Sequence, residues 1–137
     1  MNCADSSVIV ASTLTWHPHH EVSRPALESS RLAPSHAVAE AYSVLTRLPP
    51  PSRLSPDLAA DAILDIIGDV LTLPDDSLLQ LPRTLADAGV RGGATYDGLI
   101  ALTARHHRAV VLTLDRRSAR TYRALDVEFE VLEPGPD

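Results

Sequence analysis

The stretch VVLTLDRRS (residues 110–118) places a carboxylate, Asp115, directly after a run of apolar residues. A short apolar run between two helical patterns is typical of a buried strand. The same alternation of short strands and helices continues along the chain, which predicts an α/β fold with a mainly parallel central sheet flanked by helices. Ligands of such sheets bind beyond the carboxyl ends of the strands, so Asp115 lies where chemistry is usually placed.

Asp97 is expected at the same edge of the sheet as Asp115. The sequence pattern predicts a helix over residues 95–107, which would be roughly 18 Å long at about 1.5 Å per residue. It predicts a strand over residues 109–115, which would be roughly 20 Å long at about 3.3 Å per residue. Because the chain runs along the helix and returns along the strand, the two acids should finish close together.

Two further acids are expected at this edge. Asp5 ends the first predicted strand, and a helix capped by Ser6 or Ser7 follows it. Glu40 lies in the second turn of a helix that we expect Ser35 to cap, and the residues on both sides of this glutamate are apolar. A lone carboxylate in such a stretch indicates that it faces a group that compensates its charge.

Each acid, taken alone, also has a plain structural explanation. Asp97 would complement a helix dipole, Asp115 would be a helix N-cap, Asp5 would be a turn residue, and Glu40 would face water. Four such coincidences at one edge are less probable than one site. Other acids follow helical spacing and are interpreted as a solvated stripe: Asp57, Asp61, Asp65 and Asp69.

Four carboxylates that lie together need a counter-charge to stay ionised. Ligands that offer only oxygen suit Mg²⁺ or Mn²⁺ rather than zinc. A divalent ion held by carboxylates lowers the pKa of a bound water, orients a phosphate and neutralises developing charge. The pattern therefore predicts a metal-dependent phosphodiester hydrolase.

The bulk composition sets limits on this interpretation. A chain of 137 residues accommodates one domain, expected over residues 1–133, with a short tail at residues 134–137. Its net charge of −6 argues against an extended basic surface for nucleic acid, although not against acids gathered in one cleft. Cys3 is the only cysteine, which excludes an internal disulfide. With neither a signal peptide nor a membrane-length apolar segment in view, we expect a cytoplasmic protein without membrane contact.

Four stretches of the sequence together resemble PIN domains, and specifically VapC-type toxins of bacterial toxin–antitoxin pairs, over nearly the whole chain. The similar stretches are ADSSVIVA (residues 4–11), AVAEAYSVLTRLP (residues 37–49), GGATYDGLIALTARHH (residues 92–107) and VVLTLDRRSARTYRALDVEFEVL (residues 110–132). The family's four acids carry over to Asp5, Glu40, Asp97 and Asp115. The family's small hydroxyl residue after the first aspartate carries over to Ser6, and Thr113 lies two residues before the fourth acid.

This resemblance implies a Mg²⁺-dependent endoribonuclease that cuts transfer or ribosomal RNA. It also implies a homodimer that is neutralised by a VapB-type antitoxin, whose C-terminal segment blocks the acidic cleft, often through an arginine. We expect the four acids to hold one or two Mg²⁺ ions, or Mn²⁺, and a metal-activated water to cut the RNA. The hydroxyls of Thr113 and Ser6 would support the carboxylates or touch the phosphate. Arg116 and Arg117 would contact the RNA backbone, unless they are solvated helix charges.

Other classes of protein fit the sequence less well. A haloacid dehalogenase-type phosphatase needs a second aspartate where this chain has Ser7. That class and the phospho-receiver module both use a lysine, and all 12 basic residues here are arginine. A dinucleotide-binding domain would need GxGxxG after a strand. The remaining alternative is a catalytically idle partner or regulatory protein with a PIN-like fold.

The histidines and the aromatic residues suggest no second site. His17, His19 and His20 cluster, but no cysteine accompanies them and Pro18 interrupts the helical spacing. A metal site there is therefore disfavoured. Trp16 and Tyr42 are expected in the core rather than in contact with nucleic-acid bases.

Overall fold

A computed structural model describes residues 1–134 of the chain, in which five short strands alternate with eight helices. The strands are β1 (Asn2–Ala4), β2 (Leu32–Pro34), β3 (Asp69–Leu71), β4 (Val110–Thr113) and β5 (Phe129–Val131). The helices are α1 (Ser6–Thr13), α2 (His20–Ser30), α3 (Ser35–Thr46), α4 (Pro56–Ile66), α5 (Asp75–Leu79), α6 (Leu81–Asp87), α7 (Ala94–His106) and α8 (Arg116–Ala124).

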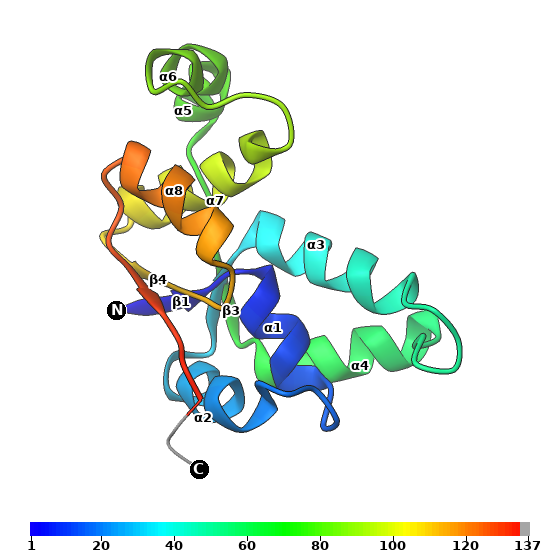
Figure 1. Ribbon diagram of the computed structural model, residues 1–137. Helices are drawn as coiled ribbons and strands as arrows, with labels where there is room; N and C mark the ends of the chain where they lie inside the picture. Colours follow the sequence, from blue (N-terminus) through cyan, green and yellow to red (C-terminus); the bar gives the residue numbers. More distant parts are fainter. Residues whose placement is uncertain (135–137) are drawn as a thin grey trace.

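The described strands pair only in parallel. Three of them form a sheet in the order β1-β4-β5, with Ala4 opposite Leu112 and Leu112 opposite Glu130. The other two, β2 and β3, form a parallel pair, and β2 packs beside β1 (Figure 1). The predicted α/β fold with a parallel sheet is therefore confirmed. β1 and β4 share one direction, so the segments that follow them leave the sheet at the same edge.

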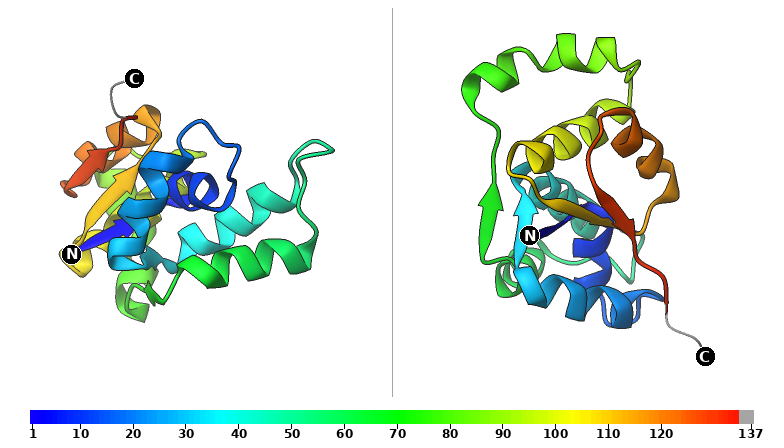
Figure 2. Two further views of the ribbon diagram at one scale, coloured as in Figure 1. Left: turned by 90° about the horizontal axis from the view of Figure 1, so that it is seen from below. Right: turned by 90° about the vertical axis from the view of Figure 1, so that its left-hand side faces the viewer.

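Helices cover the strands from both sides. Figure 1 shows α1 and α2 on one side of the strands and α7 and α8 on the other. Five of the eight residues of α1 are buried, which explains why its sequence is apolar around most of its circumference. The α3 and α4 helices extend away from the strands as an antiparallel pair (Figure 2). The buried residues of all these elements join in one hydrophobic core.

Several local predictions differ from the structure. The sequence pattern also predicts a single helix over residues 76–89. The structure has two helices there, α5 and α6, because Pro82 has no backbone N–H to continue the first one. β2 was not predicted. Trp16 is 58% exposed and Tyr42 is 40% exposed, so the expectation that both belong to the core is wrong. The stripe of acids on and after α4 is exposed, as predicted.

The predicted C-terminal tail, residues 134–137, is described only at its first residue. Residues 135–137, most of the expected tail, lie outside the described residues, and Pro134 follows the last described strand as an exposed residue. Among the described residues, no helix has the length and apolar character that crossing a membrane requires.

Candidate active site

Asp5 leaves β1 and caps α1, and it is almost completely buried at 3% exposed. One of its carboxylate oxygens accepts hydrogen bonds from the Ser7 N–H (3.1 Å), the Ser7 hydroxyl (2.5 Å) and the Val8 N–H (3.4 Å). The other accepts a hydrogen bond from the Tyr122 hydroxyl at 2.8 Å. Burial raises the pKa of Asp5 above its ordinary value, and these hydrogen bonds oppose that rise. The side chain is therefore fixed in position by both oxygens.

Asp115 follows β4 and caps α8, where it accepts a hydrogen bond from the Arg117 N–H at 2.8 Å. Thr113 links this acid to Asp5. Its buried hydroxyl accepts a hydrogen bond from the Asp115 N–H at 3.0 Å and also hydrogen bonds the Asp5 carboxylate. Thr113 therefore lies where the sequence led us to expect a supporting hydroxyl.

Asp97 lies in the first turn of α7, after a turn in which Gly92 adopts φ +61°. Ser118, a buried residue of α8, lies beside the Asp97 carboxyl and the Tyr122 hydroxyl, and it lowers the pKa of both groups. Ser118 and Tyr122 thus lie between Asp97 and Asp5, and the Tyr122 hydroxyl donates to Asp5.

Sequence reasoning missed two of these linking residues, Ser118 and Tyr122. Their spacing of four residues places them on one face of α8, and the helix begins at the acid-bearing edge of the sheet. That spacing is the signal in the sequence from which they could have been found.

Glu40 reaches the site from α3. Its Oε1 lies 3.0 Å from the His36 Nε2, but the pair lacks hydrogen-bond geometry, and neither atom has a hydrogen-bond partner among the described residues. Burial raises the pKa of Glu40, the nearby charge of His36 lowers it, and Asp97 and Asp5 raise it further. The compensating group that the apolar surroundings of Glu40 led us to expect is His36.

The four acids are close enough to act on one another electrostatically. The pKa of Asp97 is raised first by burial and then by Asp5 and Asp115, whereas Ser118 and Arg117 lower it. Asp97 and Asp5 in turn raise the pKa of Glu40. Carboxylates that raise the pKa of a neighbouring carboxyl form a region that favours a cation.

One of the two predicted supporting hydroxyls, that of Ser6, does not contact Asp5. The hydroxyl on Asp5 belongs to Ser7 rather than Ser6, because the side chain two residues after a helix cap returns toward the cap. The same Ser7 hydroxyl accepts a hydrogen bond from the Leu114 N–H at 2.9 Å, which ties α1 to the end of β4. Ser6 lines a neighbouring cavity.

The two arginines after Asp115 also differ from each other. Arg116 forms an ion pair with Glu133, which follows β5. The Arg117 guanidinium is 94% exposed and lies 3.5 Å from Asp115. Arg117 is therefore the one of the two that lies beside the acids.

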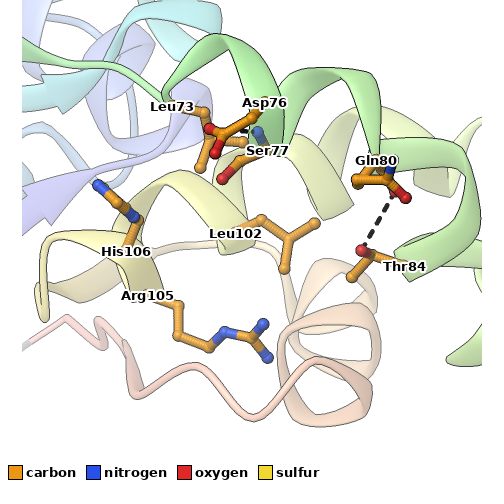
Figure 3. A pocket seen from close by; sticks show the side chains of 8 residues that line it. All are labelled: Leu73, Asp76, Ser77, Gln80, Thr84, Leu102, Arg105 and His106. Carbon is orange, nitrogen blue, oxygen red and sulfur yellow. Dashed lines mark hydrogen bonds between the residues drawn. The ribbon is translucent and has the colours of Figure 1, made fainter.

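Two cavities adjoin the acids and a third lies apart from them. One of about 430 Å³ is lined by Ser6, Ser7, Val10, His17, His19, Val44, Leu114, Asp115 and Arg117. One of about 250 Å³ is lined by His36, Glu40, Ser43, Arg47 and Tyr96. The third, of about 360 Å³, lies between α5, α6 and the last turn of α7, where Arg105 and His106 line it (Figure 3). Because Asp97 is at the opposite end of α7, this third cavity is separate from the acids.

Comparison with known proteins adds to this geometry. The sequence model of the PIN domain matches residues 3–124. The chain belongs to the PIN-domain family. Among its relatives is "Ribonuclease VapC40" of two strains of Mycobacterium tuberculosis, which is 43% identical over 133 residues, covering 96% of this chain and 99% of the relative. "Ribonuclease VapC27" of the same species is 39% identical over 121 residues, covering 88% of this chain and 82% of the relative. This PIN domain is therefore of the VapC type, as its sequence motifs predicted.

The acids of this PIN domain fit a hard divalent ion by their chemistry. All four side chains offer oxygen, and the rise that neighbouring acids cause in the pKa of Glu40 and Asp97 favours a cation. Among residues 1–134, no three acid, histidine or cysteine side chains are arranged to ligate one ion directly. Mg²⁺ usually keeps several waters and uses one or two carboxylates, so direct ligation by three side chains is not required.

Proposed function

We propose that this VapC-type PIN domain is a Mg²⁺-dependent endoribonuclease toxin. The observation that carries the proposal is the gathering of Asp5 and Asp115, which follow two parallel strands, with Glu40 of α3 and Asp97 of α7. Asp5 and Asp97 raise the pKa of Glu40, and Asp5 and Asp115 raise the pKa of Asp97. The high identity to "Ribonuclease VapC40" over almost the full length of both chains supports the ribonuclease assignment. The net negative charge of the chain is compatible with it, because a cation bound by the four acids of the candidate site would offset their charge where an RNA phosphate approaches.

The four acids Asp5, Glu40, Asp97 and Asp115 would hold the ion. Bound Mg²⁺, or Mn²⁺, would supply a Lewis acid for the phosphate and increase the acidity of a water. Thr113 and Ser7 fix the Asp5 and Asp115 ends of the cluster through their hydrogen bonds. The exposed guanidinium beside Asp115 would bind an RNA phosphate. Hydrolysis would leave 5′-phosphate and 3′-hydroxyl ends.

We further propose that a VapB-type antitoxin neutralises this chain and that the toxin acts in the cytoplasm as a homodimer. An arginine from the antitoxin would complement the acidic cluster and compete with the metal ion. The α4 helix leaves Leu58 and Leu64 exposed, which supports a protein partner on this part of the molecule. Co-purification of the chain with the product of its neighbouring gene tests this proposal, and a chain that stays monomeric and unbound would contradict it.

Cleavage of RNA by the purified chain tests the ribonuclease proposal. We expect cleavage with Mg²⁺ and none with a chelator. Asp5→Asn should slow cleavage by about 100- to 1000-fold, the usual effect of removing one charge-stabilising group. Asp61→Asn is the matched control, because Asp61 is an exposed acid of α4 outside the cluster. A wild-type chain that folds but cuts no RNA would instead indicate the catalytically idle partner.

The RNA that is cut is proposed to be transfer or ribosomal RNA. Sequencing of 5′ ends after induction of the chain would identify it. Cuts confined to messenger RNA would contradict this part of the proposal.

A further inference from the structure

The α3 helix carries four polar side chains along one face. His36, Glu40, Ser43 and Arg47 are spaced by four, three and four residues, which places them in one row on a helix. The row is roughly 16 Å long at about 1.5 Å per residue. Together with Tyr96 of α7, these four residues line the cavity of about 250 Å³ beside the acids. Glu40 belongs to the acid cluster, so the row continues the site rather than forming a separate one.

One end of this cavity is a flat platform of two rings. The His36 imidazole and the Tyr96 ring are nearly parallel, with an interplanar angle of 7° and centroids 5.2 Å apart. Tyr96 is nevertheless 55% exposed, so much of its ring remains open to solvent. The residue after Tyr96 is Asp97. An exposed aromatic ring, already stacked on one neighbour, thus lies directly beside the acids.

The other end of the cavity carries a positive charge. Arg47 is exposed at the end of α3, and its charge lowers the pKa of Glu40. A guanidinium suits a phosphate group, which it contacts through several N–H donors. The cavity therefore combines a stacking surface, a hydroxyl and a phosphate-binding group along one line.

We propose that this row and Tyr96 bind a single-stranded stretch of the RNA substrate, with an unpaired base stacked on the Tyr96–His36 platform and a phosphate of the same strand on Arg47. The inference rests on the proposed ribonuclease function and deepens it. RNA sequences are read mainly where bases are unpaired and stack on aromatic side chains, whereas the bases of a duplex are covered by their neighbours. The Tyr96–His36 platform therefore suits an unpaired base rather than a base inside a duplex.

Binding of a fluorescent RNA tests this proposal. The probe is a short single-stranded RNA of mixed sequence that carries an adenine analogue whose fluorescence is quenched by stacking. All variants are made in the Asp5→Asn chain, which prevents cleavage. Tyr96→Ala should weaken binding by about 5- to 150-fold and abolish the quenching, the loss expected for one stacked base. Tyr96→Phe keeps the ring and should preserve both.

Two controls make the result specific. Tyr42→Ala removes a different exposed tyrosine, which lies on α3 and does not line the cavity. This change should leave RNA binding unchanged. A duplex of the same sequence should bind equally to the parent chain and to Tyr96→Ala. The platform would be overturned if Tyr42→Ala weakened RNA binding as much as Tyr96→Ala does. It would also be overturned if Tyr96→Phe weakened RNA binding as much as Tyr96→Ala does. Circular dichroism of each variant confirms that it is folded.

Failure of this inference is distinct from failure of the proposed function. Weaker single-strand binding by Tyr96→Ala supports the platform whether or not the wild-type chain cuts RNA. Unchanged binding by Tyr96→Ala overturns the platform, even if the wild-type chain is an active ribonuclease.

Discussion

Asp5 shows at the level of single residues how a buried charge is held in place. Its carboxylate receives hydrogen bonds from the backbone and from side chains of α1 and α8. The sequence indicated Asp5 because a strand ends there. It could not indicate Tyr122, which is 117 positions away along the chain and contacts Asp5 only through tertiary packing.

Tyr122→Phe tests the importance of this contact. The change removes a buried hydroxyl and leaves one oxygen of Asp5 without that donor. We expect the free energy of unfolding to fall by about 1.5–3 kcal/mol, the range for a hydrogen bond to a charged group. Urea denaturation measures it, with Tyr42→Phe as the control on an exposed tyrosine. A loss no larger than that of Tyr42→Phe would show that the hydrogen bond does not hold Asp5.

At the level of elements, the acids gather because helices begin where parallel strands end. Asp115 caps α8, which is the structural role that the sequence suggested for it. Asp5 was expected as a turn residue before a helix capped by Ser6 or Ser7, but it is itself the cap of α1. The sequence predicted α7 to within one residue at each end. It did not predict β2, because three residues ending in proline give too short a pattern for a strand.

The sequence also predicts a helix that begins at Ser55-Pro56 with Leu58, Ala62 and Ile66 on one face, and this predicted face is only partly the buried one. Ser55 caps the helix, as expected from the sequence. The buried residues are Ala59, Ile63 and Ile66, whereas Leu58 is exposed. Sequence periodicity finds an amphipathic helix, but here a row of apolar residues continues onto the outer face, and only tertiary packing decides which row is buried.

Ser55→Ala separates stability from activity. The Ser55 hydroxyl accepts a hydrogen bond from the Leu58 N–H at 3.3 Å, and losing such a cap costs about 0.5–2 kcal/mol. We therefore expect a lower melting temperature. RNA cleavage measured well below that temperature should be unchanged, because α4 carries none of the four acids. Reduced cleavage by a fully folded Ser55→Ala chain would contradict this separation.

At the scale of the whole molecule, the raised pKa values in the acid cluster make the fold less stable at neutral pH. A carboxyl whose pKa is higher in the folded chain holds its proton more tightly there. The folded chain therefore binds more protons than the unfolded chain above the ordinary aspartate value of 3.8, and stability decreases as the pH rises from that value. Burial and neighbouring acids raise the pKa of Asp97 in this way.

Asp97→Asn should therefore stabilise the chain at neutral pH in the absence of divalent ions. The amide keeps an oxygen beside Ser118 but carries no charge. We expect the melting temperature to rise by a few degrees at pH 7 and the difference to disappear below pH 3.8, where the wild-type carboxyl is protonated in both states. Thermal melts across this range measure it. A variant that is less stable than the wild type at pH 7 would contradict the expected repulsion.

The central claim is that four acids from distant parts of the chain bind one divalent centre. Titration of Mn²⁺ followed by electron paramagnetic resonance tests it most directly. We predict that the wild-type chain binds Mn²⁺ and that Asp5→Asn, Glu40→Gln, Asp97→Asn and Asp115→Asn each weaken binding by at least about 10-fold, whereas Asp61→Asn does not. A wild-type chain that binds no Mn²⁺, or any of the four variants with wild-type affinity, would contradict the claim.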